Sequence, residues 1–130
     1  MSRDPRKLRV FQQADELVVE VYRITEGLPL EERYGLQAQA RRAAVSVAVN
    51  IVEGCARRTQ AEYLQFLNIA TGSAAESQYL ISLIERLRMM AAGSTSDLCG
   101  KYGALLASLQ ALTAALEGRG PRGRGPRSRT

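Results

Sequence analysis

The sequence predicts an all-α fold, a helical bundle built as one domain. Hydrophobic residues make up 45% of the 130-residue chain, but aromatic residues only 5%, and Trp is absent. Alanine, leucine and valine dominate the apolar set, which favours helix packing over a β-sandwich. These residues recur at steps of three and four along stretches without proline, the spacing of one helix face. A chain of this length fits a single core.

The first predicted helix covers residues 7–26. Its apolar positions are Leu8, Phe11, Ala14, Leu17, Val18, Val21 and Tyr22. Their spacing of three and four residues places them on one face. Gly27, Pro29 and Gly35 then interrupt the pattern, so residues 28–35 are expected to form a connection that reverses the chain.

The second predicted helix, residues 36–54, is apolar around most of its circumference. Gly54 is expected to end it, because glycine readily takes the left-handed conformation that closes many helices. At about 100° per residue, its polar residues share one narrow arc. They are Gln39, Arg42, Ser46, Asn50 and Glu53. The arc is either the solvent face of an amphipathic helix or a functional stripe. The rest of the helix surface is apolar and wider than one bundle buries, which favours self-association.

The third predicted helix covers residues 60–92 and the fourth covers residues 96–117. Thr59 and Glu62 have the spacing of a capping box, in which each side chain satisfies a free backbone amide at the helix start. Thr95 or Ser96 is expected to cap the fourth helix. Its first turns are weakened by two glycines, so this start is the least defined boundary.

The third helix carries small and polar residues that could face the polar arc of the second. They are Gly72, Ser73, Glu76 and Ser77. We expect a buried hydrogen-bonded layer that includes Asn50 and Ser73. Layers of this kind fix register more than they add stability.

The chain offers no recognisable catalytic, metal or cofactor site. Glu53 and Glu76 could form a carboxylate pair, but the sequence has no histidine, which removes di-iron bundles, histidine-activated nucleophiles and the usual zinc sites. Gly72 and Ser73 lack the spacing and the lysine of a phosphate-binding loop. Two cysteines form neither a disulfide framework nor a four-ligand set, and are expected to be small buried hydrophobes. We therefore predict no enzymatic activity, no cofactor and no small-molecule substrate.

The net charge of +5 resides in the C-terminal tail. Residues 118–130 hold five arginines and no acid, and the other thirteen basic residues equal the thirteen acidic ones. Without apolar residues the tail is expected to be disordered. Arginine among glycine and proline can pair with phosphates and stack on bases, although a purely solvating terminus is the alternative. The candidate nucleic-acid-binding residues are Arg41, Arg42, Arg57, Arg58, Arg119, Arg122, Arg124, Arg127 and Arg129.

No membrane segment is expected. No stretch approaches the roughly 20 apolar residues of a membrane-spanning helix, and the first residues lack the apolar region of a secretory signal. The predicted location is the cytoplasm.

Several short motifs resemble the family of 23S rRNA intervening-sequence proteins. The resemblance begins at Leu8, Val10 and Phe11, is most specific from Glu32 to Gly54, and extends to about Leu116. The motifs that carry it are Glu32-Arg33-Tyr34-Gly35-Leu36, Gln39, Arg41-Arg42-Ala43-Ala44-Val45-Ser46, Asn50-Ile51, Glu53-Gly54, Glu62-Tyr63, Phe66-Leu67, Ile69-Ala70, Gly72-Ser73 and Glu76. The chain departs from the pattern at Phe11, Ala48 and Ser77, where the family often has Trp, Pro and Leu, and the tail is not part of it.

This resemblance implies an up-down-up-down antiparallel four-helix bundle that assembles into a homopentamer without enzymatic activity. The family is similar in turn to the accessory variability determinant of diversity-generating retroelements, which implies binding of RNA or DNA and of a reverse transcriptase. The leading hypothesis is therefore a homo-oligomeric nucleic-acid-binding accessory protein. The alternative is a structural or protein-interaction bundle of the same family with no nucleic-acid role.

Overall fold

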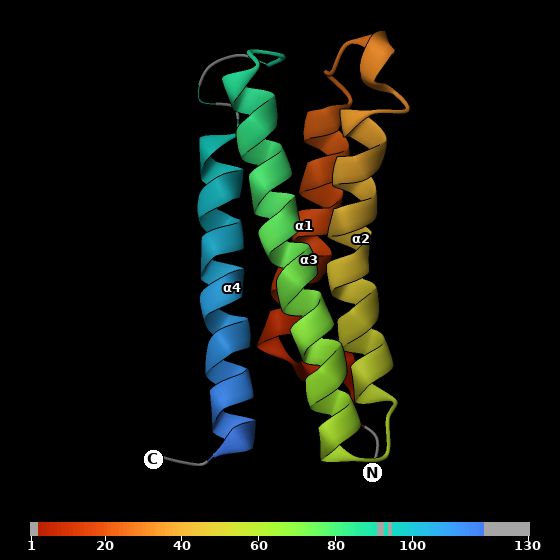
Figure 1. Cartoon of the computed structure of the whole chain (residues 1–130), viewed down its shortest axis with the longest axis vertical. Coiled ribbons are helices and arrows are strands. Elements are labelled where there is room, and N and C mark those ends of the chain that lie inside the picture. Colours follow the sequence, from red (N-terminus) through yellow and green to blue (C-terminus); the bar gives the residue numbers. More distant parts are fainter. Residues whose placement is uncertain (1–2, 91–92, 94, 119–130) are drawn as a thin grey trace.

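Four antiparallel helices form the bundle in the computed structural model, which describes residues 3–90, 93 and 95–118. The helices are α1 (Arg9–Thr25), α2 (Leu36–Cys55), α3 (Gln60–Arg86) and α4 (Ser96–Glu117), and they run alternately up and down (Figure 1). The described residues contain no strand, which confirms the predicted all-α bundle. The predicted tail falls outside the described residues from residue 119 onward.

The four helices enclose one core. α1 and α3 each contact both α2 and α4, which places the helices at the corners of a square. Val21, Ile51, Leu67, Ile81 and Leu105 are among the fully buried side chains, and each helix contributes at least one of them. No helix in the described part of the chain is long and apolar enough to cross a bilayer.

α1 begins two residues later than its sequence pattern predicts. A short 3-10 turn, η1 (Pro5–Lys7), comes first, and the Asp4 carboxylate accepts a hydrogen bond of 3.0 Å from the backbone N–H of Arg6 at its start. Proline fits this first position because it has no N–H to lose. The periodicity of α1 could not reveal that the chain takes this tighter turn first.

The connection between α1 and α2 contains a second 3-10 turn, η2 (Leu30–Glu32). The Glu32 carboxylate accepts a hydrogen bond of 3.0 Å from the backbone N–H of Leu36 and so caps α2. A Cβ at Gly35 would lie 2.6 Å from the same carboxylate oxygen. A side chain at Gly35 would therefore displace this carboxylate oxygen from its place beside the N–H of Leu36.

Gly54 does not end α2, contrary to the prediction. The helix continues to Cys55, and its cap, Ala56, keeps a right-handed conformation with φ −85°. A Cβ at Gly54 would lie 3.0 Å from Cβ of Phe66 and 3.2 Å from Cδ1 of Tyr63. Gly54 thus allows α3 to pack closely against the last turn of α2.

The start of α3 agrees with prediction, and its end does not. The hydroxyl of Thr59 accepts a hydrogen bond of 3.1 Å from the N–H of Glu62, which is half of the predicted capping box. α3 ends at Arg86, six residues before the predicted boundary of 92, because Arg88 takes a left-handed conformation with φ 57°. Residues 87–90 are not helical, and residues 91 and 92 lie outside the described chain.

Backbone hydrogen bonds close the last turn of α3 in a Schellman motif. Met89 N–H donates to the carbonyl of Ile84 at 3.3 Å, and Arg88 N–H donates to the carbonyl of Glu85 at 3.0 Å. Glycine usually occupies the left-handed position of this motif. An arginine there left no stop signal in the sequence.

α4 begins at Ser96 as predicted. Thr95 occupies the cap position, but its hydroxyl makes no capping bond and is buried without a partner among the described residues. The two glycines near the start, Gly100 and Gly103, lie inside the helix. Packing against α3 and α1 therefore outweighs their low helix propensity.

Candidate nucleic-acid interface

One end of the bundle carries six of the thirteen lysine and arginine residues in the part of the chain that the structure describes. α1 and α3 begin there, and α2 and α4 end there (Figure 1). Arg3 N–H donates to the carbonyl of Cys55 at 3.0 Å, and the Gln60 side chain donates to the carbonyl of Leu116 at 2.7 Å. These bonds hold residues 3–9, 53–62 and 114–118 together, and we call this set the basic end.

The basic end carries a modest surplus of positive charge. Its basic residues are Arg3, Arg6, Lys7, Arg9, Arg57 and Arg58, and its acidic residues are Asp4, Glu53, Glu62 and Glu117. The ion pair between Arg6 and Asp4, at 3.1 Å, lowers the pKa of that carboxyl through their hydrogen bond. The five tail arginines follow Gly118, which belongs to the same end. They lie outside the described residues, so their contribution here rests on charge and on the point of attachment.

Two arginines of the basic end stack on rings of α3. The guanidinium of Arg57 lies 4.6 Å from the centroid of Phe66, and that of Arg3 lies 3.9 Å from the centroid of Tyr63. Both are cation–π contacts. Arg58, next in the chain, is exposed and stacks on no ring of the described chain. The basic end therefore has one exposed arginine held against a ring, Arg57, and one exposed arginine without such a contact, Arg58.

The predicted basic residues are not all brought together. Arg41 and Arg42 belong to the first half of α2, at the opposite end of the bundle. The Arg41 guanidinium donates to the Thr25 hydroxyl at 2.9 Å and to the Tyr22 carbonyl at 3.1 Å, and lies 4.4 Å from the Tyr22 ring. Arg41 thus stabilises the carboxyl end of α1, whereas Arg42 is exposed.

Sequence reasoning missed the N-terminal contribution to this interface. Arg3, Arg6, Lys7 and Arg9 are scattered in the sequence and show no pattern of their own. An antiparallel bundle, however, places the start of its first helix beside the turn between its second and third. The proximity of the N-terminal basic residues to Arg57 and Arg58 could therefore have been predicted from the helix order.

The predicted polar layer between α2 and α3 exists, with Ser46 as its link. The Ser46 and Ser73 hydroxyl oxygens are 2.8 Å apart, and the Asn50 amide donates to the carbonyl and the hydroxyl of Ser46 at 2.8 and 3.1 Å. Ser77 in turn donates to the carbonyl of Ser73 at 2.9 Å. Asn50 and Ser73 do not bond directly, and the layer is half-buried where a buried one was expected.

The other signature residues lie outside that layer. Gln39, Arg42, Glu53, Gly72 and Glu76 are exposed. Apolar side chains of the same two helices are also exposed: Val49 by 42%, Val52 by 41% and Ile69 by 46%. The isolated bundle therefore leaves apolar surface of α2 and α3 uncovered, as the sequence of α2 predicts.

The described residues offer little for catalysis. They contain no group of three His, Cys, Asp or Glu that could hold a metal ion. Cys55 and Cys99 are free thiols, and burial raises the pKa of both. A raised pKa leaves less thiolate at neutral pH, which lowers nucleophilicity.

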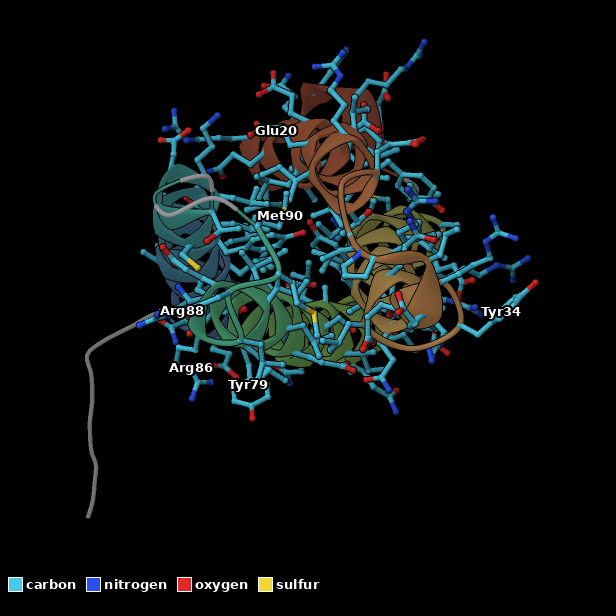
Figure 2. The ribbon with its side chains drawn as sticks, turned by 90° about the horizontal axis from the view of Figure 1, so that it is seen from above. Glu20, Tyr34, Tyr79, Arg86, Arg88 and Met90 are labelled. Carbon is cyan, nitrogen blue, oxygen red and sulfur yellow. The ribbon has the colours of Figure 1, made fainter. Side chains whose placement is uncertain are left out.

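A second group of cationic and aromatic side chains lies on the outer side of α3, near the opposite end. Figure 2 shows Tyr79, Arg86 and Arg88 pointing away from the bundle, with Tyr34 projecting from the α1–α2 connection. The Arg86 guanidinium lies 5.7 Å from the Tyr79 centroid. Cationic and aromatic side chains therefore also meet away from the basic end, where they provide a comparison for its stacked pairs.

Comparison with known proteins shows similarity to a family model and to a solved structure. A family model described as 23S rRNA-intervening sequence protein matches residues 6–111. A crystal structure of a protein of unknown function from the S23 ribosomal protein family of Bacteroides thetaiotaomicron has a TM-score of 0.73 and 21% sequence identity. The similarity covers 80% of this chain and 94% of that one, and at this identity it supports the fold alone. The comparison with curated proteins gives no match.

Proposed function

Because this chain belongs to the family of 23S rRNA-intervening sequence proteins, we propose that it is a non-catalytic, homo-oligomeric scaffold that binds RNA or DNA. The observation that carries the nucleic-acid part is the basic end. Arg57 and Arg58 lie beside the N-terminal basic residues there, and the arginine tail is attached at the same place. Arginines gathered in this way give salt-dependent affinity for phosphate backbones.

The test is a binding titration with fluorescent single-stranded RNA and duplex DNA at about 50 and about 200 mM salt. Four proteins are compared: the full chain, a chain ending at Gly118, the double variant Arg57→Gln/Arg58→Gln, and the control Arg42→Gln. We expect salt-sensitive binding by the full chain and weaker binding by the shortened chain and the double variant. Arg42→Gln, an exposed arginine at the opposite end, should bind as the full chain does. No binding of either probe at the lower salt would overturn the proposal.

Self-association is supported by the uncovered apolar side chains of α2 and α3. Val49 and Val52 are each about two-fifths exposed in the single chain, which is unusual for large apolar side chains on neighbouring turns of one helix. We expect Val49→Lys to shift the protein toward monomer in sedimentation velocity without unfolding it. Gln110→Lys, an equal charge placed on an exposed position of α4, is the control. Monomeric wild-type protein at micromolar concentration would exclude the assembly.

The stoichiometry of five and a reverse transcriptase partner are proposed from the family resemblance stated above. Light scattering of the full chain tests the first. Co-purification with a reverse transcriptase encoded next to this gene tests the second.

The same exposed apolar side chains also favour the second candidate function, a protein-interaction bundle with no nucleic-acid role. The two candidates differ in one outcome. An oligomer that binds neither probe at low salt supports the second.

A further inference from the structure

In the basic end, the guanidinium of Arg57 lies over the ring of Phe66. This contact indicates which part of a nucleic acid the basic end would bind. We infer that Arg57 contacts the phosphate backbone of a nucleic acid, that Phe66 is its positioning residue, and that the basic end recognises backbone without reading bases. The inference rests on the proposed nucleic-acid function and deepens it.

Phe66 is itself held in place. The side chain of Phe66 is half-buried. Its Cβ packs so closely against Gly54 that a Cβ added at Gly54 would lie only 3.0 Å away. A side chain at Gly54 would require Phe66 to shift by a few tenths of an ångström. Gly54 therefore sets the position of the ring, and the ring sets the position of the guanidinium 4.6 Å from its centroid.

Stacking leaves the hydrogen-bonding edge of Arg57 available. The guanidinium carbon lies over the Phe66 ring, and an aromatic ring contact leaves the guanidinium N–H donors without an oxygen acceptor. Arg57 is exposed, and its guanidinium forms no ion pair or hydrogen bond within the described chain, although its backbone N–H donates to the carbonyl of Gly54 at 3.1 Å. An arginine already ordered in this way loses less side-chain entropy when it binds a phosphate with two parallel bonds.

The rings of the basic end are not free to stack on bases. Arg57 lies over Phe66 and Arg3 lies over Tyr63, and Tyr63 is 1% exposed. The exposed tyrosines, Tyr22, Tyr34 and Tyr79, belong to other parts of the bundle, and Figure 2 shows the last two. Phosphate contacts position a nucleic acid but carry no sequence information. The expected ligand is therefore a sugar–phosphate backbone of any sequence.

Arg58 provides a matched comparison in the same turn. It is exposed like Arg57, carries the same charge, and lacks the ring beneath it. Lysine keeps the charge but loses the planar fork and most of the stacking. Arg57→Lys should therefore weaken binding by about two- to fivefold per site, the size of an exposed cation–π contact. Arg58→Lys should leave affinity unchanged.

The experiment measures affinity and its salt dependence for full-length wild type, Arg57→Lys, Arg58→Lys, Phe66→Leu and the double variant Arg57→Lys/Phe66→Leu. The probes are single-stranded RNAs of equal length, one of uridines, one of adenines and one of mixed sequence. We expect Phe66→Leu to lose as much affinity as Arg57→Lys, the double variant to lose no more than either, and the three RNAs to bind alike. Tyr22→Leu, which removes the ring under Arg41 at the opposite end, should bind as wild type does.

Three results separate the possibilities. If wild type binds RNA and the Arg57→Lys and Arg58→Lys variants have equal affinity, the positioning role of Phe66 is wrong while the proposed function stands. If one RNA is strongly preferred and the preference survives Tyr79→Leu, binding without base reading is wrong. If wild type binds no probe at low salt, the proposed function and this inference both fail. Should Phe66→Leu fail to fold in a thermal melt, the comparison of the two lysine variants decides.

Discussion

Replacing Gly54 by alanine tests whether this glycine serves packing and not helix termination. Gly54 lies inside α2, where alanine would normally stabilise the helix by about 0.5–1 kcal/mol. The added methyl group, however, would lie 3.0 Å from Cβ of Phe66 and 3.2 Å from Cδ1 of Tyr63. Neither atom belongs to the far end of a flexible chain, so the added methyl group requires a shift of a few tenths of an ångström in the packing of α3 against α2.

Such overpacking costs about 1–3 kcal/mol. After the helix gain is subtracted, Gly54→Ala should destabilise the bundle by about 0–2 kcal/mol. The same substitution at Gly100, in α4, meets no atom within 4 Å. Gly100→Ala should therefore stabilise the fold by about 0.5–1 kcal/mol. The close contact is present at the buried Gly54 and absent at the exposed Gly100.

Urea denaturation followed by circular dichroism measures both free energies of unfolding at equal protein concentration, because self-association would otherwise shift the apparent stability. Gly54→Ala should unfold at a lower midpoint than wild type and Gly100→Ala at a higher one, with similar slopes. Equal stabilisation by the two alanines would refute the packing role of Gly54.

Two further predictions concern a buried hydroxyl and a strained backbone. Burial raises the pKa of Tyr102 to about 12, while the nearby Ser77 hydroxyl acts to lower it. Tyr102 Oη makes no hydrogen bond in the described chain. Because this pKa lies above the unfolded value of 10.0, the stability is complete below pH 10 and declines by about 3 kcal/mol toward pH 12. Tyr102→Phe should remove this loss of stability at high pH and change the free energy of unfolding at pH 7 by less than about 1 kcal/mol. Unfolding curves at pH 7 and pH 11 measure both effects. If the variant loses as much stability between these pH values as wild type does, the prediction is wrong. Arg88→Gly should raise the stability by about 0.5–1 kcal/mol in thermal melts, because glycine takes the left-handed conformation without strain, and a lower melting temperature would contradict this.

Local signals predicted most of the helix boundaries. Gly27 and Pro29 mark the end of α1, and Thr59 marks the start of α3 through a side-chain bond that the structure contains. Each of these signals acts within one turn of the residue that carries it. The early stop of α3 escaped prediction because Arg88, a residue with no preference for the left-handed conformation, occupies the turn.

The candidate interface was only partly predictable, since it depends on contacts between distant segments. Arg57 and Arg58 stand out as a basic pair in the sequence, and so do Arg41 and Arg42. Charge alone cannot tell that Arg41 is bound to the end of α1. The convergence of the N-terminal residues with the α2–α3 turn follows from the order and direction of the helices.

The central claim is that nucleic acid binds at the basic end of the bundle. Amide hydrogen exchange of the full chain, with and without a saturating single-stranded RNA, tests it most directly. We predict added protection in residues 3–9, 53–62 and 114–118, and no change in residues 28–42 at the opposite end. Protection confined to residues 28–42, or no protection anywhere under conditions where the RNA is bound, would contradict the account.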